Sequence, residues 1–85
     1  MKLSFTKKFI RDYHKLPSHI QEQTDRQLGL LLENSQHPSL NTKKMHDPRN
    51  IWEARVNFSY RLTFQIGDDC YILRRVGTHD ILEKP

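Results

Sequence analysis

Apolar residues recur with helical spacing in the first half of the chain and alternate as in strands in the second half. Leu3–Phe5 alternates apolar and polar positions and predicts a short strand. In Lys7–Leu16 and Ser18–Asn34 apolar residues recur every three or four positions, which predicts two amphipathic helices. Pro17 lies between them and ends the first helix, so we expect a tight reversal and an antiparallel helical hairpin.

The second half predicts three successive strands. Ser35–Asn50 is polar and interrupted by prolines, so we expect a loop there, with or without a short strand. Strand alternation follows in Ile51–Phe58 and in Tyr60–Ile66. Gly67-Asp68-Asp69 has the composition of a hairpin turn and precedes a third strand, Cys70–Val76. The three strands should form an antiparallel meander.

The alternation also separates two faces of this meander. The apolar side of its first strand is formed by Trp52, Ala54, Val56 and Phe58. The opposite side collects Arg55 and, from the next strand, Arg61. We therefore expect an α+β fold in which the N-terminal strand and the helical hairpin pack on one face of a small antiparallel sheet. The other face is left for a polyanion.

Composition restricts the kind of protein further. The 85 residues fit a single domain, 1–85, because a second core would bury too little surface. Lys and Arg number 14 against 10 Asp and Glu, a net charge of +4. This balance favours an acidic or phosphate-bearing partner without choosing among RNA, DNA and an acidic polypeptide.

Several classes of protein are disfavoured by the sequence. Cys70 is the single cysteine and has no partner for an internal disulfide, and charged residues interrupt any apolar run that could form a signal peptide or a membrane span. We therefore expect a cytoplasmic protein. The five His residues lack the paired spacing of a zinc site, and Gly67 and Gly77 stand singly at turns. No metal or small-molecule cofactor is expected.

Four motifs, in their order along the chain, resemble those of a known family. Lys43-Lys44-Met45-His46 precedes Trp52-Glu53-Ala54-Arg55-Val56, and Tyr60-Arg61-Leu62-Thr63-Phe64 opens the next strand. Arg75-Val76-Gly77-Thr78-His79 ends the last strand. Over nearly its whole length the chain resembles the RelE/ParE superfamily of bacterial toxin–antitoxin toxins. Its C-terminal motif is similar to the YafQ-type branch of ribosome-dependent mRNA endonucleases.

The resemblance implies a RelE-like, microbial ribonuclease-type fold and metal-independent cleavage of mRNA on the ribosome, which inhibits translation. In such a reaction a 2′-hydroxyl attacks the neighbouring phosphorus, which requires a base, an acid and positive charge. His79 matches a catalytic His of the YafQ-type toxins, and Arg61 matches the strand Arg that stabilises phosphate charge. The base is open: His46 is the first candidate, with equal weight for an exposed loop His that has no role.

The resemblance also implies which residues bind the substrate and which protein partner the chain has. Lys43, Lys44, Arg55 and Arg75 are the expected substrate-binding cations. The expected protein partner is a cognate antitoxin, an acidic and largely disordered chain that orders on binding and covers the basic face or the helical hairpin.

Two other functions stay open. The first is a ParE-like inhibitor of DNA gyrase, which requires neither His79 nor Arg61. The second is a relative that binds its antitoxin without catalysis, because Asp80–Pro85 has no Tyr or Phe to stack on a base. Trp52 and Tyr60 are expected to lie with the core instead.

Overall fold

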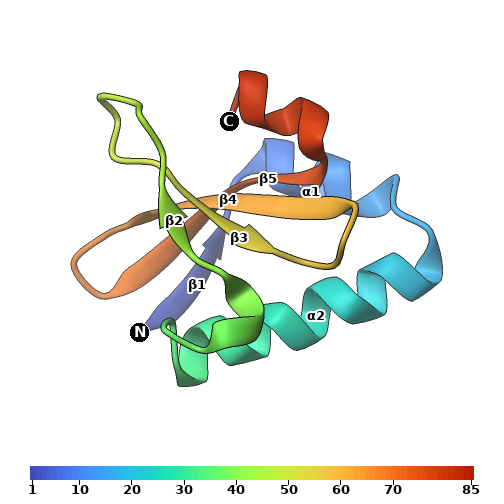
Figure 1. Ribbon diagram of the computed structural model, residues 1–85, viewed down its shortest axis with the longest axis horizontal. Coiled ribbons are helices and arrows are strands. Elements are labelled where there is room, and N and C mark those ends of the chain that lie inside the picture. The colour runs from blue at the N-terminus through green and yellow to red at the C-terminus, as the bar shows by residue number, and fades with distance from the viewer.

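A five-stranded sheet organises the protein, and the computed structural model describes all residues 1–85 (Figure 1). The strands are β1 (Lys2–Phe5), β2 (Lys43–Lys44), β3 (Trp52–Arg55), β4 (Tyr60–Ile66) and β5 (Cys70–Thr78). They lie in the order β1-β5-β4-β3-β2. The predicted meander is confirmed, since β3, β4 and β5 pair antiparallel, and β2 adds an antiparallel edge. β1 pairs parallel to β5 and makes the sheet mixed, a pairing that alternation within Leu3–Phe5 does not encode.

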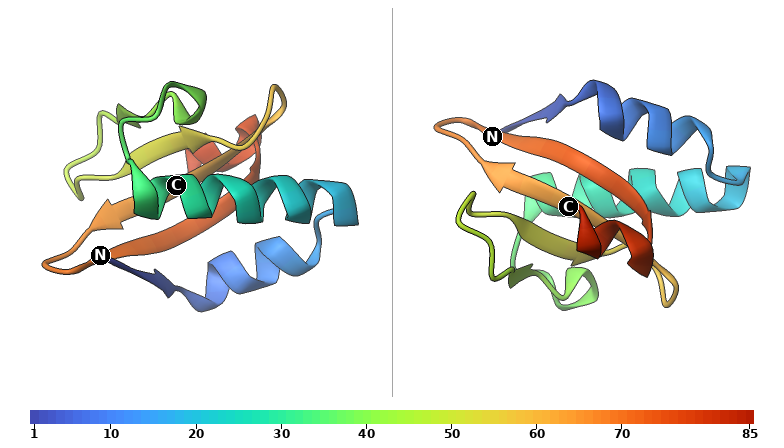
Figure 2. Two further views of the ribbon diagram at one scale, coloured as in Figure 1. Left: turned by 90° about the horizontal axis from the view of Figure 1, so that it is seen from below. Right: turned by 90° about the horizontal axis from the view of Figure 1, so that it is seen from above.

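The predicted helical hairpin is also confirmed. It consists of α1 (Lys7–His14) and α2 (Ser18–Glu33), which lie side by side and antiparallel in Figure 2. Thr6 caps α1, because its hydroxyl oxygen accepts a hydrogen bond from the Phe9 amide at 3.1 Å. Two short 3₁₀ helices complete the chain, η1 (Pro38–Leu40) and η2 (His79–Glu83). Neither α-helix has the length and apolar character needed to cross a membrane.

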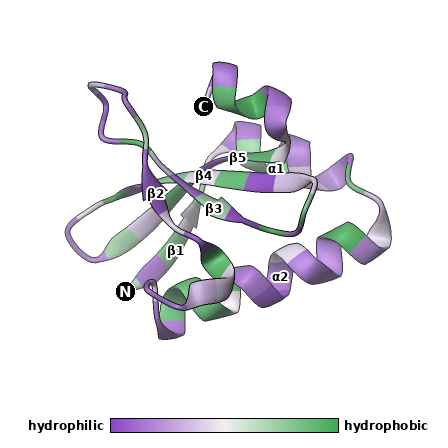
Figure 3. Ribbon diagram, in the orientation of Figure 1, coloured by the Kyte–Doolittle hydropathy of each residue, from purple (hydrophilic) through white to green (hydrophobic).

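α2 covers one face of the sheet. Its buried residues are Ile20, Thr24, Gln27, Leu28 and Leu31. They join the inward residues of the sheet in one core, to which β4 contributes Leu62 and Phe64. The buried polar groups are satisfied: the Thr24 hydroxyl donates to the Ile20 carbonyl, and the Gln27 amide donates to the Arg55 carbonyl at 2.9 Å. The outward side of α2 is mostly hydrophilic (Figure 3).

α1 lies beside the sheet, next to the edge of β5 that β1 leaves unpaired. β1 pairs with β5 only as far as Leu73. Beyond that point the Asp12 carboxylate accepts a hydrogen bond from the Val76 amide at 3.2 Å and pairs with Arg75 at 2.7 Å. An open strand edge invites pairing with other chains, and α1 covers it. α1 still joins the common core through Phe9, whereas its neighbour Ile10 is 44% exposed.

The face opposite α2 is only partly open, which corrects the prediction of a free face. The chain turns back after β5, and η2 packs on that face (Figure 1). Ile81 is buried there, and its Cγ2 would lie 2.9 Å from a Cβ atom placed on Gly77. Thr63 is fully buried, and its hydroxyl donates to the Pro85 carbonyl at 3.2 Å. The C-terminal segment therefore divides this face into two regions.

The first strand of the meander is shorter than predicted. β3 ends at Arg55, and the side chain of Asn57 then accepts hydrogen bonds from the amides of Ser59 and Tyr60. This local hydrogen bonding competes with the strand ladder and forms the turn into β4. Phe58 is 89% exposed at that turn, so its predicted place in the core is wrong.

Candidate functional site

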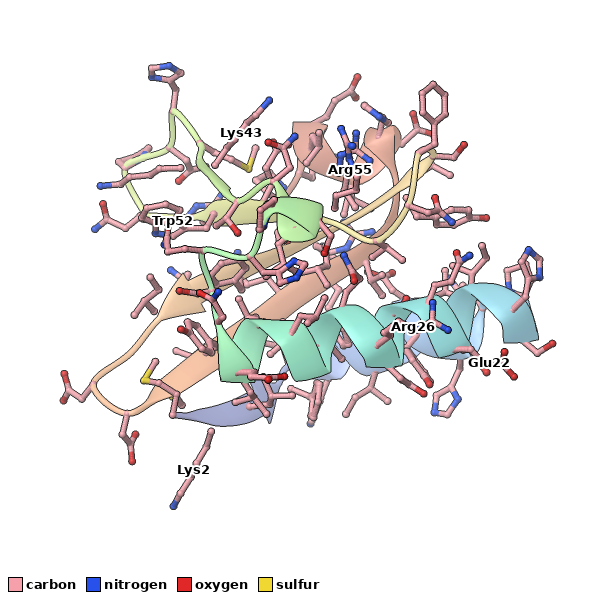
Figure 4. All side chains as sticks on the ribbon, turned by 60° about the horizontal axis from the view of Figure 1, so that its bottom comes forward. Lys2, Glu22, Arg26, Lys43, Trp52 and Arg55 are labelled. Atoms are coloured by element: carbon pink, nitrogen blue, oxygen red, sulfur yellow. The ribbon has the colours of Figure 1, made fainter.

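Two arginines lie next to each other on the sheet face opposite α2. Arg55 of β3 pairs in register with Arg61 of β4, and Arg61 pairs with Gly77 of β5. The neighbouring residues Ala54 and Leu62 are fully buried in the core, so strand alternation directs both guanidinium groups away from α2. Figure 4 shows Arg55 on that side of the sheet.

Arg61 is held by the turn that follows β3. Its Nη1 donates to the Asn57 carbonyl at 2.7 Å and to the Tyr60 carbonyl at 3.1 Å. No carboxylate forms an ion pair with Arg61 or Arg55, because the two ion pairs of the protein join Arg49 to Asp47 and Arg75 to Asp12. A guanidinium fixed by neutral carbonyls keeps its full charge for an incoming anion.

His79 lies at the same end of the sheet as Arg61. It is exposed and begins η2, one residue after Thr78, which pairs with Tyr60 at the start of β4. Arg61 is the next residue of β4 and pairs with Gly77. The fold therefore brings three predicted site residues to the same end of the sheet: Arg55 from β3, Arg61 from β4 and His79 from η2, which follows β5.

His46 lies at the other end of the sheet. Its loop joins β2 to β3, and the Gln65 side-chain amide donates to the Arg49 carbonyl of this loop at 2.8 Å. β4 extends about 20 Å from Tyr60 to Ile66 at about 3.3 Å per residue. His46 and His79 are thus near opposite ends of β4, and the structure does not bring them together.

The two lysines of β2 lie on different faces. Lys43 pairs with Glu53, which shares the Arg55 face, whereas Lys44 pairs with Trp52, which packs against the core on the α2 side. Lys43 is therefore the lysine that faces the same side as the arginines, and Figure 4 shows it on that side. Glu53 is half-buried and supplies a carboxylate to this face.

Arg75 is engaged by the protein itself. Its Nε donates to Asp12 Oδ2 at 2.7 Å, and its Nη1 donates to the Lys84 carbonyl at 3.0 Å. These bonds connect β5 to α1 and to the C-terminal segment, two residues along β5 from Gly77, the partner of Arg61. Arg75 differs from Arg55 and Arg61 because its guanidinium is bound to Asp12 and to the C-terminal segment.

Phe58 also lies near this group, although the alternation of its strand predicts it in the core. It lies in the turn between β3 and β4, and its carbonyl is 3.5 Å from Arg61 Nη1. Exposed aromatic rings provide surfaces on which nucleic acid bases stack. The sequence Asn57-Phe58-Ser59 itself indicates a turn, because Asn and Ser favour turns. A residue in a turn does not follow the apolar–polar alternation of a strand.

The loop that carries His46 is braced by an exposed ion pair. Arg49 donates to Asp47 through Nε at 3.0 Å and through Nη2 at 2.8 Å. These bonds, with one from the Arg49 amide, lower the pKa of Asp47 from 3.8 to about 2. Asp47 is therefore ionised at neutral pH. No group of three or more His, Cys, Asp or Glu side chains is placed to hold a metal ion.

Comparisons with known proteins identify the family. The model of the family described as "ParE toxin of type II toxin-antitoxin system, parDE" matches residues 3–82. The chain belongs to this family. The toxin is also 30% identical over 82 residues to Toxin RelE3 of Methanocaldococcus jannaschii, which covers 89% of this chain and 88% of that one. It is thus a RelE/ParE superfamily toxin of a toxin–antitoxin system.

Solved structures of other toxins share the fold. YafQ from E. coli strain BL21(DE3) superposes with a TM-score of 0.78 at 15% identity, over 95% of this toxin and 96% of YafQ. The RelB–RelE antitoxin–toxin complex from Methanococcus jannaschii contains a chain with a TM-score of 0.74 at 24% identity, and the match covers 95% of each chain. At these identities the likeness concerns the α+β architecture, which confirms the predicted fold class.

Proposed function

We propose that this toxin cleaves mRNA on the ribosome by a metal-independent attack of a 2′-hydroxyl on the adjacent phosphorus. The observation that supports it is the grouping of two arginines without acidic partners, Arg55 and Arg61, with the exposed imidazole of His79 at one end of the sheet. The site is an open surface, so the ribosome would hold the RNA in the strained geometry that the attack requires.

Each group has a role in this proposal. Arg61 and Arg55 stabilise the charge of the pentavalent phosphate, a task suited to permanent charge and several donors. His79 protonates the leaving 5′-oxygen, a role that an imidazolium can fill as a positioned general acid. Glu53 lies two residues from Arg55 on the same face, whereas His46 lies at the other end of β4. We therefore assign removal of the 2′-hydroxyl proton to Glu53 in preference to His46.

Phe58 completes the proposed site as a base-stacking group. Its exposed ring stands at the turn that holds Arg61, so a base beside the scissile phosphate can stack on it while the guanidinium contacts the phosphate. In this toxin a turn residue would replace the aromatic group that the C-terminal segment lacks.

The test is cleavage of mRNA bound to purified ribosomes. We expect His79→Ala to slow formation of discrete cuts by about 10²- to 10⁴-fold, the usual contribution of an acid or base. His19→Ala is the matched control, because His19 is an exposed histidine at the start of α2, and α2 packs on the opposite face of the sheet from Arg55 and Arg61. Circular dichroism confirms that both variants fold. Unchanged cleavage by His79→Ala would contradict the proposed mechanism.

Inhibition of DNA gyrase is the second candidate, because the matching family model is that of the ParE toxin. The same variants distinguish the two functions. A gyrase inhibitor would block supercoiling of plasmid DNA by purified gyrase and leave ribosome-bound mRNA intact, and the His79→Ala variant would keep that inhibition. The ribonuclease function is supported if His79→Ala abolishes mRNA cleavage and the unmodified toxin leaves supercoiling of plasmid DNA by gyrase unchanged.

We further propose that a cognate antitoxin binds the apolar groove beside α1. This groove has a volume of about 250 Å³, and its apolar lining comprises Phe5, Phe9, Ile10, Tyr13 and Leu28. Phe5 and Ile10 are 45% and 44% exposed, which is the kind of surface into which an amphipathic helix docks. The net charge of +4 favours an acidic partner. Solved relatives of this fold include toxin–antitoxin complexes.

A further inference from the structure

A second hollow lies on the far side of the C-terminal segment from the Arg55 and Arg61 pair. It has a volume of about 420 Å³, and no hydrophobic residue lines it. Its charged lining consists of Lys8, Arg49, Arg74, Arg75, Lys84 and Glu83, and we call it the basic pocket. It lies between the start of α1, the β2–β3 loop, the middle of β5 and the end of the chain.

A β-bulge supplies the two central cations. Thr63 of β4 pairs with Arg75, but the next residue, Phe64, pairs with Leu73, so Arg74 is an extra residue on β5. In a regular strand, consecutive side chains point to opposite faces. The bulge breaks this alternation and lets Arg74 and Arg75 both line the same pocket.

Both guanidinium groups are fixed in place by the protein. Arg74 donates from Nε to the Pro85 carbonyl at 3.0 Å and from Nη1 to the Gln65 side chain at 3.1 Å. Arg75 donates to Asp12 and to the Lys84 carbonyl. Since their conformational entropy is already lost, an anion that binds there does not have to order them.

The pocket keeps a surplus of positive charge. Asp12 neutralises Arg75, and Asp47 neutralises Arg49 at the rim. Lys8 and Lys84 form no ion pair and Glu83 is the one acidic side chain of the lining, while Arg74 donates to the backbone oxygen of Pro85, the last residue in the sequence. Five cationic side chains thus line a pocket that has no hydrophobic residue in its wall, a composition suited to a phosphate group.

We propose that the basic pocket binds a backbone phosphate of RNA, separate from the site at Arg55, Arg61 and His79. An acidic peptide is the alternative occupant. Peptide interfaces rely on buried apolar and aromatic anchors, and the basic pocket offers none, whereas the groove beside α1 offers several. This proposal rests on the proposed function, because it gives the toxin a second contact with RNA. The two contacts lie on either side of the C-terminal segment that η2 and Pro85 form.

The test compares two double variants of equal net charge. Lys8→Gln with Lys84→Gln removes two pocket cations, while Lys7→Gln with Lys15→Gln removes two exposed lysines of α1 and its C-cap that do not line the pocket. The probe is a single-stranded RNA with 2′-O-methyl groups, which the toxin cannot cut by 2′-hydroxyl attack. Binding is measured by fluorescence anisotropy at several salt concentrations, with the same titration on purified ribosomal subunits.

We expect the pocket variant to bind at least tenfold more weakly, and its log–log salt slope should fall by about 0.7 for each phosphate that it no longer neutralises. The control should bind less than threefold more weakly. Weakening on the oligonucleotide identifies mRNA as the source of the phosphate, and weakening confined to the subunits identifies ribosomal RNA; each supports the pocket. Equal weakening in both variants would overturn it, because binding would then follow net charge alone.

A second measurement tests whether the basic pocket binds phosphate or carboxylate groups. Inorganic phosphate should shift the side-chain Nε–Hε NMR signals of Arg74 and Arg75 in the unmodified toxin, and a hexaglutamate peptide should not. Stronger binding of hexaglutamate, abolished in the pocket variant, would replace RNA by an acidic protein segment. Because no cleavage is measured, failure of the ribonuclease mechanism leaves this test unaffected.

Discussion

The turn between β3 and β4 holds an apolar side chain in solvent, although apolar side chains usually lie in the core. Phe58 is apolar and continues the alternation of the strand before it, yet the Asn57 side chain binds the next two amides and ends the strand. The ring therefore remains in solvent beside Arg61, whose Nη1 binds the carbonyls of the same turn. An exposed aromatic ring gains little from burial on folding, and the proposed function assigns this ring to base stacking.

At this scale we expect Phe58→Ala to weaken binding of the 2′-O-methyl RNA by tenfold or more, since stacking on one base contributes about 1–3 kcal/mol. Its stability should change by less than about 0.5 kcal/mol, as for other surface substitutions. Phe58→Trp should retain binding. Ile66→Ala is the control, because Ile66 is also an exposed apolar residue near a hairpin but lies at the other end of β4. Equal affinities for Phe58→Ala and the unmodified toxin would remove the stacking role.

At the scale of elements, α1 substitutes for a missing strand. The edge of β5 beyond Leu73 would expose its amides and carbonyls, and Thr6 and Asp12 satisfy them from the two ends of α1. Asp12 is only 13% exposed and also binds Arg75, so it joins helix, strand and basic pocket. The position of α1 therefore depends on a few polar contacts in addition to the burial of Phe9.

Asp12→Asn tests this connection. Removal of the charge should reduce the free energy of unfolding by about 1.5–3 kcal/mol, the usual contribution of hydrogen bonds to charged groups. Asp68→Asn makes the same charge change in the exposed β4–β5 turn and should be neutral. Urea denaturation monitored by circular dichroism gives both values. Equal midpoints for the two variants would show that Asp12 contributes no more than a surface charge.

The whole molecule presents two surfaces of different character on different sides. The face opposite α2 carries the arginines, divided by η2 into the Arg55 and Arg61 region and the basic pocket. The groove beside α1 is apolar. In the proposed function RNA binds the first surface and the antitoxin anchors on the second, so inhibition requires the antitoxin to extend from the groove across the arginines.

Ile10→Asp tests the groove as the anchor. Because Ile10 is already 44% exposed, the free toxin should lose little stability, whereas its complex with the cognate antitoxin should weaken by at least tenfold, as when a charge enters an apolar interface. Ile66→Asp is the matched control, since Ile66 is 53% exposed and lies outside the groove. Isothermal titration calorimetry measures both affinities. Equal weakening by the two variants would exclude the groove as a specific anchor.

Much of the fold could be predicted from the sequence because its cues are local. Pro17, the helical spacing on each side of it and the alternation in β4 are read from a few neighbouring residues, and each element formed where expected. The prediction of the candidate site was less complete. Arg55 and Arg61 share a face because β3 and β4 are joined by a short turn, but the separation of His46 from His79 depends on which end of the sheet each loop reaches.

The sequence by itself determined the helical hairpin, the antiparallel meander and the grouping of Arg55 with Arg61, since side chains within about ten residues of each other set these features through period and turn chemistry. Tertiary structure decided the parallel pairing of β1 with β5, the return of η2 over Thr63, and the basic pocket. These features join residues that are distant in the sequence, such as Asp12 and Arg75, which are 63 positions apart. No local pattern specifies which distant backbone and side-chain groups will meet.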